Sequence, residues 1–96
     1  SNPMNDFIDE LFATLQERKR NPTPNSYTAS LLTAGEDEIV KKIGEEAVEV
    51  ILAAKGQGEQ RIVEETADLI YHLLVLLVSR DLTWDDIRAE LKQRHR

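Results

Sequence analysis

Two acidic stretches decide the fold of this chain: KKIGEEAVE at residues 41–49 and EETADLIYH at residues 64–72. In both stretches the apolar residues recur at helical spacing, so each stretch predicts a helix. Residues three apart lie on the same face of a helix. Glu46 therefore projects beside Glu49 in the first helix, and the second helix repeats this spacing.

The second acidic stretch lies on the most apolar helix of the chain. On this predicted helix, residues 59–79, most positions are apolar, and at about 100° per residue Glu65, Asp68 and His72 form one stripe. A helix that is apolar all round is typically buried. Because an unpaired buried charge is costly, we expect Glu65 and Asp68 to be carried towards an interior and to meet a positive group there.

Composition restricts the class of protein. The chain has 96 residues, a length typical of one domain, and its net charge of −6 argues against binding to a nucleic-acid polymer. It contains no cysteine, which excludes disulfides and favours a reducing compartment, the cytoplasm. The longest apolar run, Leu69–Val78, is too short to cross a bilayer, so we expect no membrane association.

The order of elements predicts a single all-α domain over residues 4–96, because no stretch shows a strand pattern. Ser1–Pro3 precede Met4 and resemble the remnant of an expression tag. Asn5 or Asp6 can cap the first helix. Helices are expected at about 7–20, 36–55, 59–79 and from 84 onward, with fraying at 93–96. Residues 26–35 are ambiguous and predict a helical turn at Thr28–Leu32 followed by a turn at Gly35.

The connections predict an antiparallel helical bundle that is completed by a second copy of the chain. Gly56–Gly58 is a clear stop between two helices, and Thr83 with Asp86 resembles a capping box at the start of the last helix. The helix 59–79 has no solvent face, and the helix before it carries a second apolar edge. So short a chain cannot cover both, so we expect a homodimer or a larger assembly.

The carboxylates themselves favour a metal site. Two antiparallel helices joined by a short turn can bring Glu46 and Glu49 to Glu65 and Asp68, and four carboxylates form the oxygen-only site that Mg²⁺ or Mn²⁺ prefers. The alternative is a solvated acidic face, which the apolar surroundings of the second pair disfavour. A di-iron centre is also disfavoured, since no Glu has a His three residues after it.

The charged neighbours of these acids leave alternatives open. Glu45 either orients water and accepts a proton or is simply exposed. Lys42 and Arg61 each precede an expected ligand by four residues, so each either contacts phosphate or forms an ion pair with that acid. His72 is expected to be packed or hydrogen-bonded and not to be a ligand, and Tyr71 and Trp84 are expected to pack. The residues alone assign no role to Ser26–Thr28.

The full pattern resembles the all-α nucleoside triphosphate pyrophosphatase superfamily, called MazG-like, and within it the phosphoribosyl-ATP pyrophosphatase family of histidine biosynthesis. The resemblance covers residues 7–91. The features that carry it are SYTA at 26–29, KKIGEEAVE at 41–49, EETADLIYHL at 64–73 and SRDLTWDD at 79–86. The acidic motif alone is typical of the superfamily, whereas SYTA and the paired lysines indicate the histidine-pathway branch.

This resemblance implies hydrolysis of phosphoribosyl-ATP to phosphoribosyl-AMP and pyrophosphate, dependent on Mg²⁺, by a homodimer. It implies a separate phosphoribosyl-AMP cyclohydrolase, since this chain has no room for that domain. The implied metal ligands are Glu46, Glu49, Glu65 and Asp68, with Glu45 as a further ligand or a water-activating base. The implied substrate or phosphate contacts are Lys41, Lys42, Arg61, His72, Ser26, Tyr27 and Thr28.

Two other functions remain open at this stage. One is a house-cleaning enzyme of the same superfamily that hydrolyses free or damaged nucleoside triphosphates. The other is a helical dimerisation module without activity, whose acids are merely solvated. The module predicts no stabilisation by Mg²⁺ or Mn²⁺ and tolerance of Glu49→Gln or Asp68→Asn, so metal binding and a substrate panel separate the three.

Overall fold

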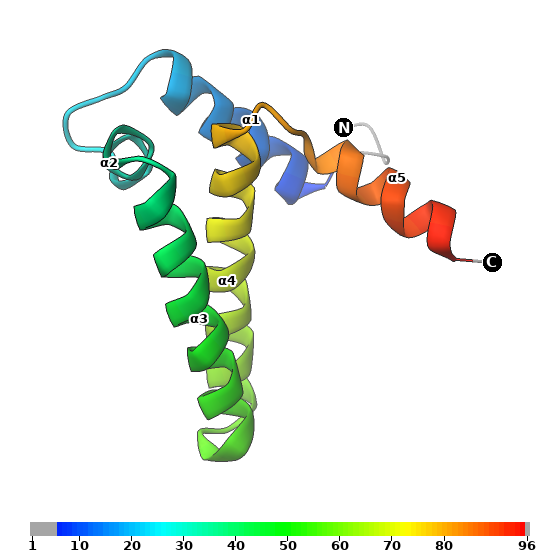
Figure 1. The fold of residues 1–96 in the computed structure, drawn as a ribbon. Helices are drawn as coiled ribbons and strands as arrows, with labels where there is room; N and C mark the ends of the chain where they lie inside the picture. Colours follow the sequence, from blue (N-terminus) through cyan, green and yellow to red (C-terminus); the bar gives the residue numbers. More distant parts are fainter. Residues whose placement is uncertain (1–5, 96) are drawn as a thin grey trace.

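The computed structural model describes residues 6–95, and in that range it contains five α-helices and no strand. They are α1 (Phe7–Arg20), α2 (Tyr27–Ala34), α3 (Glu36–Gly56), α4 (Glu59–Ser79) and α5 (Trp84–Arg94). α3 and α4 form a long antiparallel hairpin, α1 and α2 lie at one end of it, and α5 leads away from that end (Figure 1). The all-α prediction is confirmed, and the one for Ser1–Pro3 falls outside the described residues.

Local capping and turn signals set several of the predicted helix ends. Asp6 caps α1 through a capping box with Asp9, and Thr83 caps α5 in the same way with Asp86. Asn5, the other predicted cap of α1, lies outside the described residues. Gly58 has a φ of 90°, a conformation that glycine adopts without strain, and it lets the chain reverse between α3 and α4.

α2 is longer than the single turn that the sequence predicts. It is an eight-residue helix, and the Ser26 hydroxyl caps it by accepting a hydrogen bond from the Ala29 amide at 3.1 Å. Its tyrosine and threonines are weak helix formers, so the local pattern is poor. Thr28, Ala29 and Leu31 are nonetheless buried, and this tertiary packing stabilises the helix.

The hydrophobic core lies at the end of the hairpin that α1 and α2 cover. Its buried members come from α1, α2, α3 and α4, and Trp84 of α5 packs against them as predicted. They are Phe12, Leu15, Leu31, Ile39, Leu74, Val75, Leu77 and Val78. The rest of the hairpin extends beyond the other helices (Figure 1). Within the described residues, no helix is long and apolar enough to cross a membrane.

The projecting half of the hairpin exposes apolar side chains. The exposed fractions are 52% for Val48, 59% for Ile51, 47% for Leu52 and 62% for Val63. These residues lie on both α3 and α4, so the exposed surface is shared by the two helices. We call these four residues the hairpin apolar surface.

Candidate functional site

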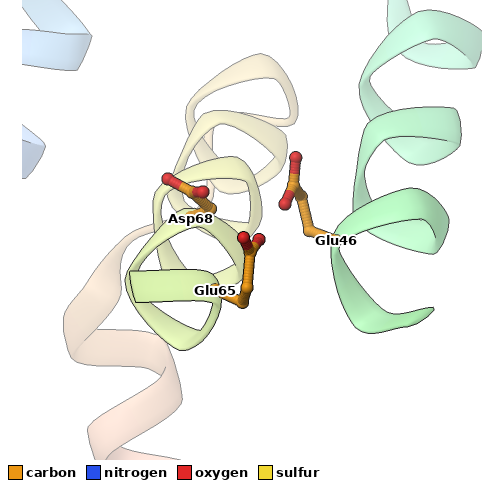
Figure 2. A group of neighbouring side chains, drawn as sticks. All are labelled: Glu46, Glu65 and Asp68. Atoms are coloured by element: carbon orange, nitrogen blue, oxygen red, sulfur yellow. The ribbon is translucent and has the colours of Figure 1, made fainter. Parts of the chain in front are cut away.

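Three carboxylates meet between the two long helices, in the middle part of the hairpin. Glu46 projects from α3 towards Glu65 and Asp68 of α4 (Figure 2). One oxygen from each carboxylate lies within 4.8 Å of the other two. The structure thus brings together three of the four predicted metal ligands. Glu49 lies about one turn further along α3, outside this group, and its role stays a prediction.

The three acids differ in exposure. Glu65 is buried, with 6% of its surface accessible, and Glu46 is partly buried. Asp68 is exposed, so the prediction that it points into an interior is wrong for the single chain. The physical reason is that the described helices leave the Asp68 position of α4 uncovered, although Glu65 and His72 on the same helix are buried. An apolar sequence all round α4 does not by itself supply neighbours on every side.

Among the described residues, Arg61 is the one that forms an ion pair with a member of this cluster. Arg61, one turn before Glu65, forms ion pairs with both Glu65 and Glu64. This is the arrangement that the sequence offered as the alternative to phosphate binding. Burial, followed by the negative charge of Asp68, raises the pKa of Glu46 above its ordinary value. The cluster therefore carries more negative charge than its side-chain neighbours balance.

The donor set fits a hard divalent cation. All three groups offer carboxylate oxygens, the ligand type that Mg²⁺ and Mn²⁺ prefer, and they come from two rigid helices. A cation between Glu46, Glu65 and Asp68 would supply the positive charge that this group lacks. The partial exposure of the cluster leaves room for water and for a ligand that completes the coordination.

The lysines before the cluster lie on the solvent side of α3. Lys42 Nζ is 3.4 Å from Glu45 Oε1, and the charge of Glu45 raises the pKa of Lys42. The ion-pair partner of Lys42 is thus Glu45 and not Glu46. Lys41 is exposed. Both lysines lie on the helix that carries Glu46, five and four residues before it.

A second polar group joins α2 to α4. His72 is buried, its Nδ1 lies 2.8 Å from the backbone oxygen of Asp68, and its Nε2 lies 2.9 Å from the hydroxyl of Tyr27. Thr28 is buried beside Tyr27, and its hydroxyl is hydrogen-bonded to that of Tyr71. His72 is therefore packed and hydrogen-bonded, as predicted. The Tyr27–His72 and Thr28–Tyr71 pairs are more than 40 residues apart in sequence, so no local pattern predicts them.

The aromatic rings fix this group in place. The rings of Tyr27 and Tyr71 stack with centroids 6.2 Å apart, and the ring of His72 meets both edge-on at 5.9 and 5.2 Å. Burial raises the pKa of the Tyr27 hydroxyl, which therefore stays protonated at neutral pH. The packing role predicted for Tyr71 is confirmed, and its ring supports that of Tyr27.

Comparisons with known proteins agree on one family. A family model described as phosphoribosyl-ATP pyrophosphohydrolase matches residues 8–95. The phosphoribosyl-ATP pyrophosphatase of Haloarcula marismortui is 49% identical over 98% of this chain and 98% of its own length. That of Limosilactobacillus fermentum is 52% identical over 91% of this chain and 82% of its own, and that of Bacillus thuringiensis is 49% identical over 88% and 79%.

Proposed function

The chain belongs to the phosphoribosyl-ATP pyrophosphohydrolase family, and from this premise we propose that its carboxylate cluster is a Mg²⁺ site that serves the family's reaction. That reaction is the hydrolysis of phosphoribosyl-ATP to phosphoribosyl-AMP and pyrophosphate in histidine biosynthesis. The chain is a hydrolase that acts on a phosphoric anhydride.

The observation that carries the proposal is the convergence of three carboxylates from α3 and α4, one of them buried, within 4.8 Å. The proposed ligands are Glu46, Glu49, Glu65 and Asp68, with Mn²⁺ as a substitute for Mg²⁺. Glu49 shares a helix face with Glu46, so in this proposal it would hold the same ion beside Glu46. When bound, Mg²⁺ neutralises triphosphate charge, polarises the attacked phosphorus and lowers the pKa of a bound water.

The remaining side chains have proposed roles in positioning and charge stabilisation, which supply most of the catalysis in phosphoryl transfer. Glu45 lies next to Glu46 on the open side of α3, where it accepts the proton of the attacking water. Lys41, Lys42 and Arg61 contribute positive charge towards the phosphates. Ser26, Tyr27, Thr28 and His72 form the part of the substrate site that α2 and α4 build together.

We further infer that the active form is a dimer, because a single chain leaves the hairpin apolar surface uncovered. Its four residues are between 47% and 62% exposed. The radius of gyration is 14.6 Å, against about 13 Å for a compact 100-residue domain. A second copy that packs along the projecting half of α3 and α4 buries these side chains and supports the helices that hold the carboxylates.

The direct test is to incubate the purified protein with phosphoribosyl-ATP and Mg²⁺ and to measure pyrophosphate, with ATP and deoxynucleoside triphosphates alongside. We expect selective turnover of phosphoribosyl-ATP, its loss with EDTA and its recovery with Mg²⁺ or Mn²⁺. Turnover of the deoxynucleotides instead would keep the metal site but change the substrate. Turnover by Glu46→Gln at the wild-type rate would exclude the cluster as the metal site.

A further inference from the structure

The hydroxyl groups of Ser26, Tyr27 and Thr28 are not equally free to meet a substrate. The Ser26 hydroxyl caps α2 by accepting a hydrogen bond from the Ala29 amide, and the buried Thr28 hydroxyl is hydrogen-bonded to that of Tyr71. Tyr27 differs from both, because 49% of its surface is exposed while its hydroxyl is held by His72 at 2.9 Å. Tyr27 is thus the member of this segment that is both positioned and accessible.

The direction of the Tyr27–His72 hydrogen bond follows from the other side of the imidazole. His72 Nδ1 lies 2.8 Å from the backbone oxygen of Asp68, and a carbonyl oxygen only accepts. The hydrogen of that bond is therefore on Nδ1, and when the ring carries this one hydrogen Nε2 is an acceptor. The Tyr27 hydroxyl consequently donates its single hydrogen to His72, and its oxygen has only lone pairs left for another group.

An oxygen in this state discriminates among substrate groups. It cannot donate to an ionised phosphate, whose oxygens are also acceptors. Among the groups of phosphoribosyl-ATP it can pair only with a hydrogen-bond donor, such as a sugar hydroxyl. Tyr27 is therefore excluded as a phosphate contact, although it lies close enough to Lys42 and Glu46 for their charges to affect its pKa.

We propose that the Tyr27 oxygen accepts a hydrogen bond from a hydroxyl of the ribose that carries the triphosphate, and that His72 is the residue that positions Tyr27 for this contact. The inference rests on the proposed function. His72 is one turn after Asp68, about 6 Å along α4. The ribose is bonded to the first phosphate, so a triphosphate held at the carboxylates brings this sugar to the same stretch of the helix.

The test compares Tyr27→Phe with Tyr71→Phe on three substrates: phosphoribosyl-ATP and its analogues that lack the 2′- or the 3′-hydroxyl of the adenosine ribose. Each substitution removes one phenolic oxygen from one of two stacked rings, but the Tyr71 hydroxyl faces Thr28 inside the protein. We expect Tyr27→Phe to lower kcat/KM for phosphoribosyl-ATP by about 3- to 10-fold, chiefly through a higher KM. Tyr71→Phe should leave KM unchanged.

The analogues identify the group that Tyr27 contacts. The wild-type protein should lose a similar factor with one of the two analogues, and Tyr27→Phe should lose nothing further with that analogue. Equal losses of Tyr27→Phe on all three substrates would overturn the inference in favour of a contact to a metal-bound water or to the base. Turnover of phosphoribosyl-ATP by the wild-type protein tests the proposed function independently of these comparisons.

The positioning role of His72 has two readouts of its own. His72→Leu should lower kcat/KM about as much as Tyr27→Phe, and the double variant should be no worse than either single variant. In His72→Gln the amide oxygen can still accept a hydrogen bond from the Tyr27 hydroxyl, so this variant should lose less activity than His72→Leu. Long-range ¹H–¹⁵N spectra of the metal-free protein should show His72 with its hydrogen on Nδ1; His95 is the only other histidine in the sequence. A hydrogen on Nε2, or additive losses, would overturn the assignment.

Discussion

The three carboxylates of the cluster repel one another, and a bound cation would offset this repulsion. Burial and the negative charge of Asp68 raise the pKa of Glu46, and Glu65 raises it further. A carboxylate whose pKa is raised in the folded state costs stability once pH rises above its ordinary value of 4.5. At neutral pH the metal-free protein therefore carries this cost.

Asp68→Asn should relieve part of that cost and at the same time damage the metal site. We expect the melting temperature of the metal-free protein to rise by about 1–4 °C, since like-charge repulsion near a surface amounts to roughly 0.2–0.5 kcal/mol. The rise that Mg²⁺ produces in the wild-type protein should disappear, and kcat/KM should fall by more than the roughly 10- to 100-fold that loss of an outer-shell partner costs.

The control for Asp68→Asn is Asp37→Asn, which makes the same change of charge at an exposed position on α3. It should keep both the Mg²⁺ response and the activity. Thermal melts with and without Mg²⁺ check the stability effects, and pyrophosphate release checks the activity. If Asp68→Asn still gained stability from Mg²⁺ as the wild-type protein does, Asp68 would not be a ligand.

For individual residues, the sequence predicted which side chains form the cluster better than it predicted their exposure and contacts. The i, i+3 spacing was enough to place Glu65 and Asp68 on one stripe, and Arg61 is the positive partner that Glu65 required. The exposure of Asp68 depends on which helices reach that part of α4, and the Tyr27–His72 contact depends on α2. Both are properties of the packing between elements, which a single stretch of sequence does not contain.

The element with the weakest local signal, α2, carries two residues of the proposed substrate site, Tyr27 and Thr28. Ser26→Ala removes the hydroxyl that accepts a hydrogen bond from the Ala29 amide. Because this bond caps α2, the substitution should lower the free energy of unfolding by about 1 kcal/mol. Ser30→Ala is the control, because the Ser30 hydroxyl is exposed and donates to the Tyr27 backbone oxygen without capping the helix. Its effect should stay below about 0.5 kcal/mol. Denaturant unfolding measures both, and equal effects would contradict the capping role.

The contact between α1 and α5 predicts a pH dependence. The Asp9 carboxylate accepts hydrogen bonds from the Asp6 amide and from Arg88, and these bonds lower the pKa of Asp9. A lowered carboxyl pKa gives stability that is present above the ordinary value of 3.8 and is lost as pH falls towards the lowered one. Asp9→Asn should therefore destabilise the protein at neutral pH, and the difference should vanish as pH falls below 3.8.

Asp85→Asn is the matched control, because Asp85 also pairs with Arg88 but its side chain is 83% exposed. Exposed ion pairs contribute little, so this variant should melt close to the wild-type protein at every pH. Melting temperatures of the three proteins across pH 2–7 check the prediction. A gap between Asp9→Asn and the wild-type protein that persists at the acid end would assign the effect to packing instead of to charge.

The bounds of the helices show which element properties are local. α3 and α4 end near where Gly56–Gly58 and the apolar periodicity place their ends, and α5 begins at the predicted capping box. These signals lie within a few residues of the helix ends. α2 has only its Ser26 cap as a local signal, and its length is set by burial against the rest of the fold. The sequence predicted the two helices that carry the carboxylates but not the length of α2.

In the whole molecule, half of the α3–α4 hairpin is left uncovered by the other described helices (Figure 1). The core lies at the end of the hairpin that α1 and α2 cover (Figure 1), while the carboxylates come from the middle part of the hairpin. The helix ends that carry the hairpin apolar surface have no other partner among the described residues. A dimer along this surface would therefore stabilise α3 and α4 on the side of the cluster that the core does not reach.

Ile51→Glu should prevent this association. Ile51 is 59% exposed in the single chain, so a glutamate there is tolerated by the monomer, but burying its charge in the dimer is costly. We expect the dissociation constant of the dimer to rise by about 100-fold or more. At micromolar concentration, light scattering should then give the mass of a single chain, 10.9 kDa, where the wild-type protein gives twice that mass. Leu91→Glu is the control, because Leu91 is 61% exposed on α5, away from the hairpin. If both variants stay dimeric, another surface forms the interface; if the wild-type protein is itself a monomer, the hairpin apolar surface has no role in self-association.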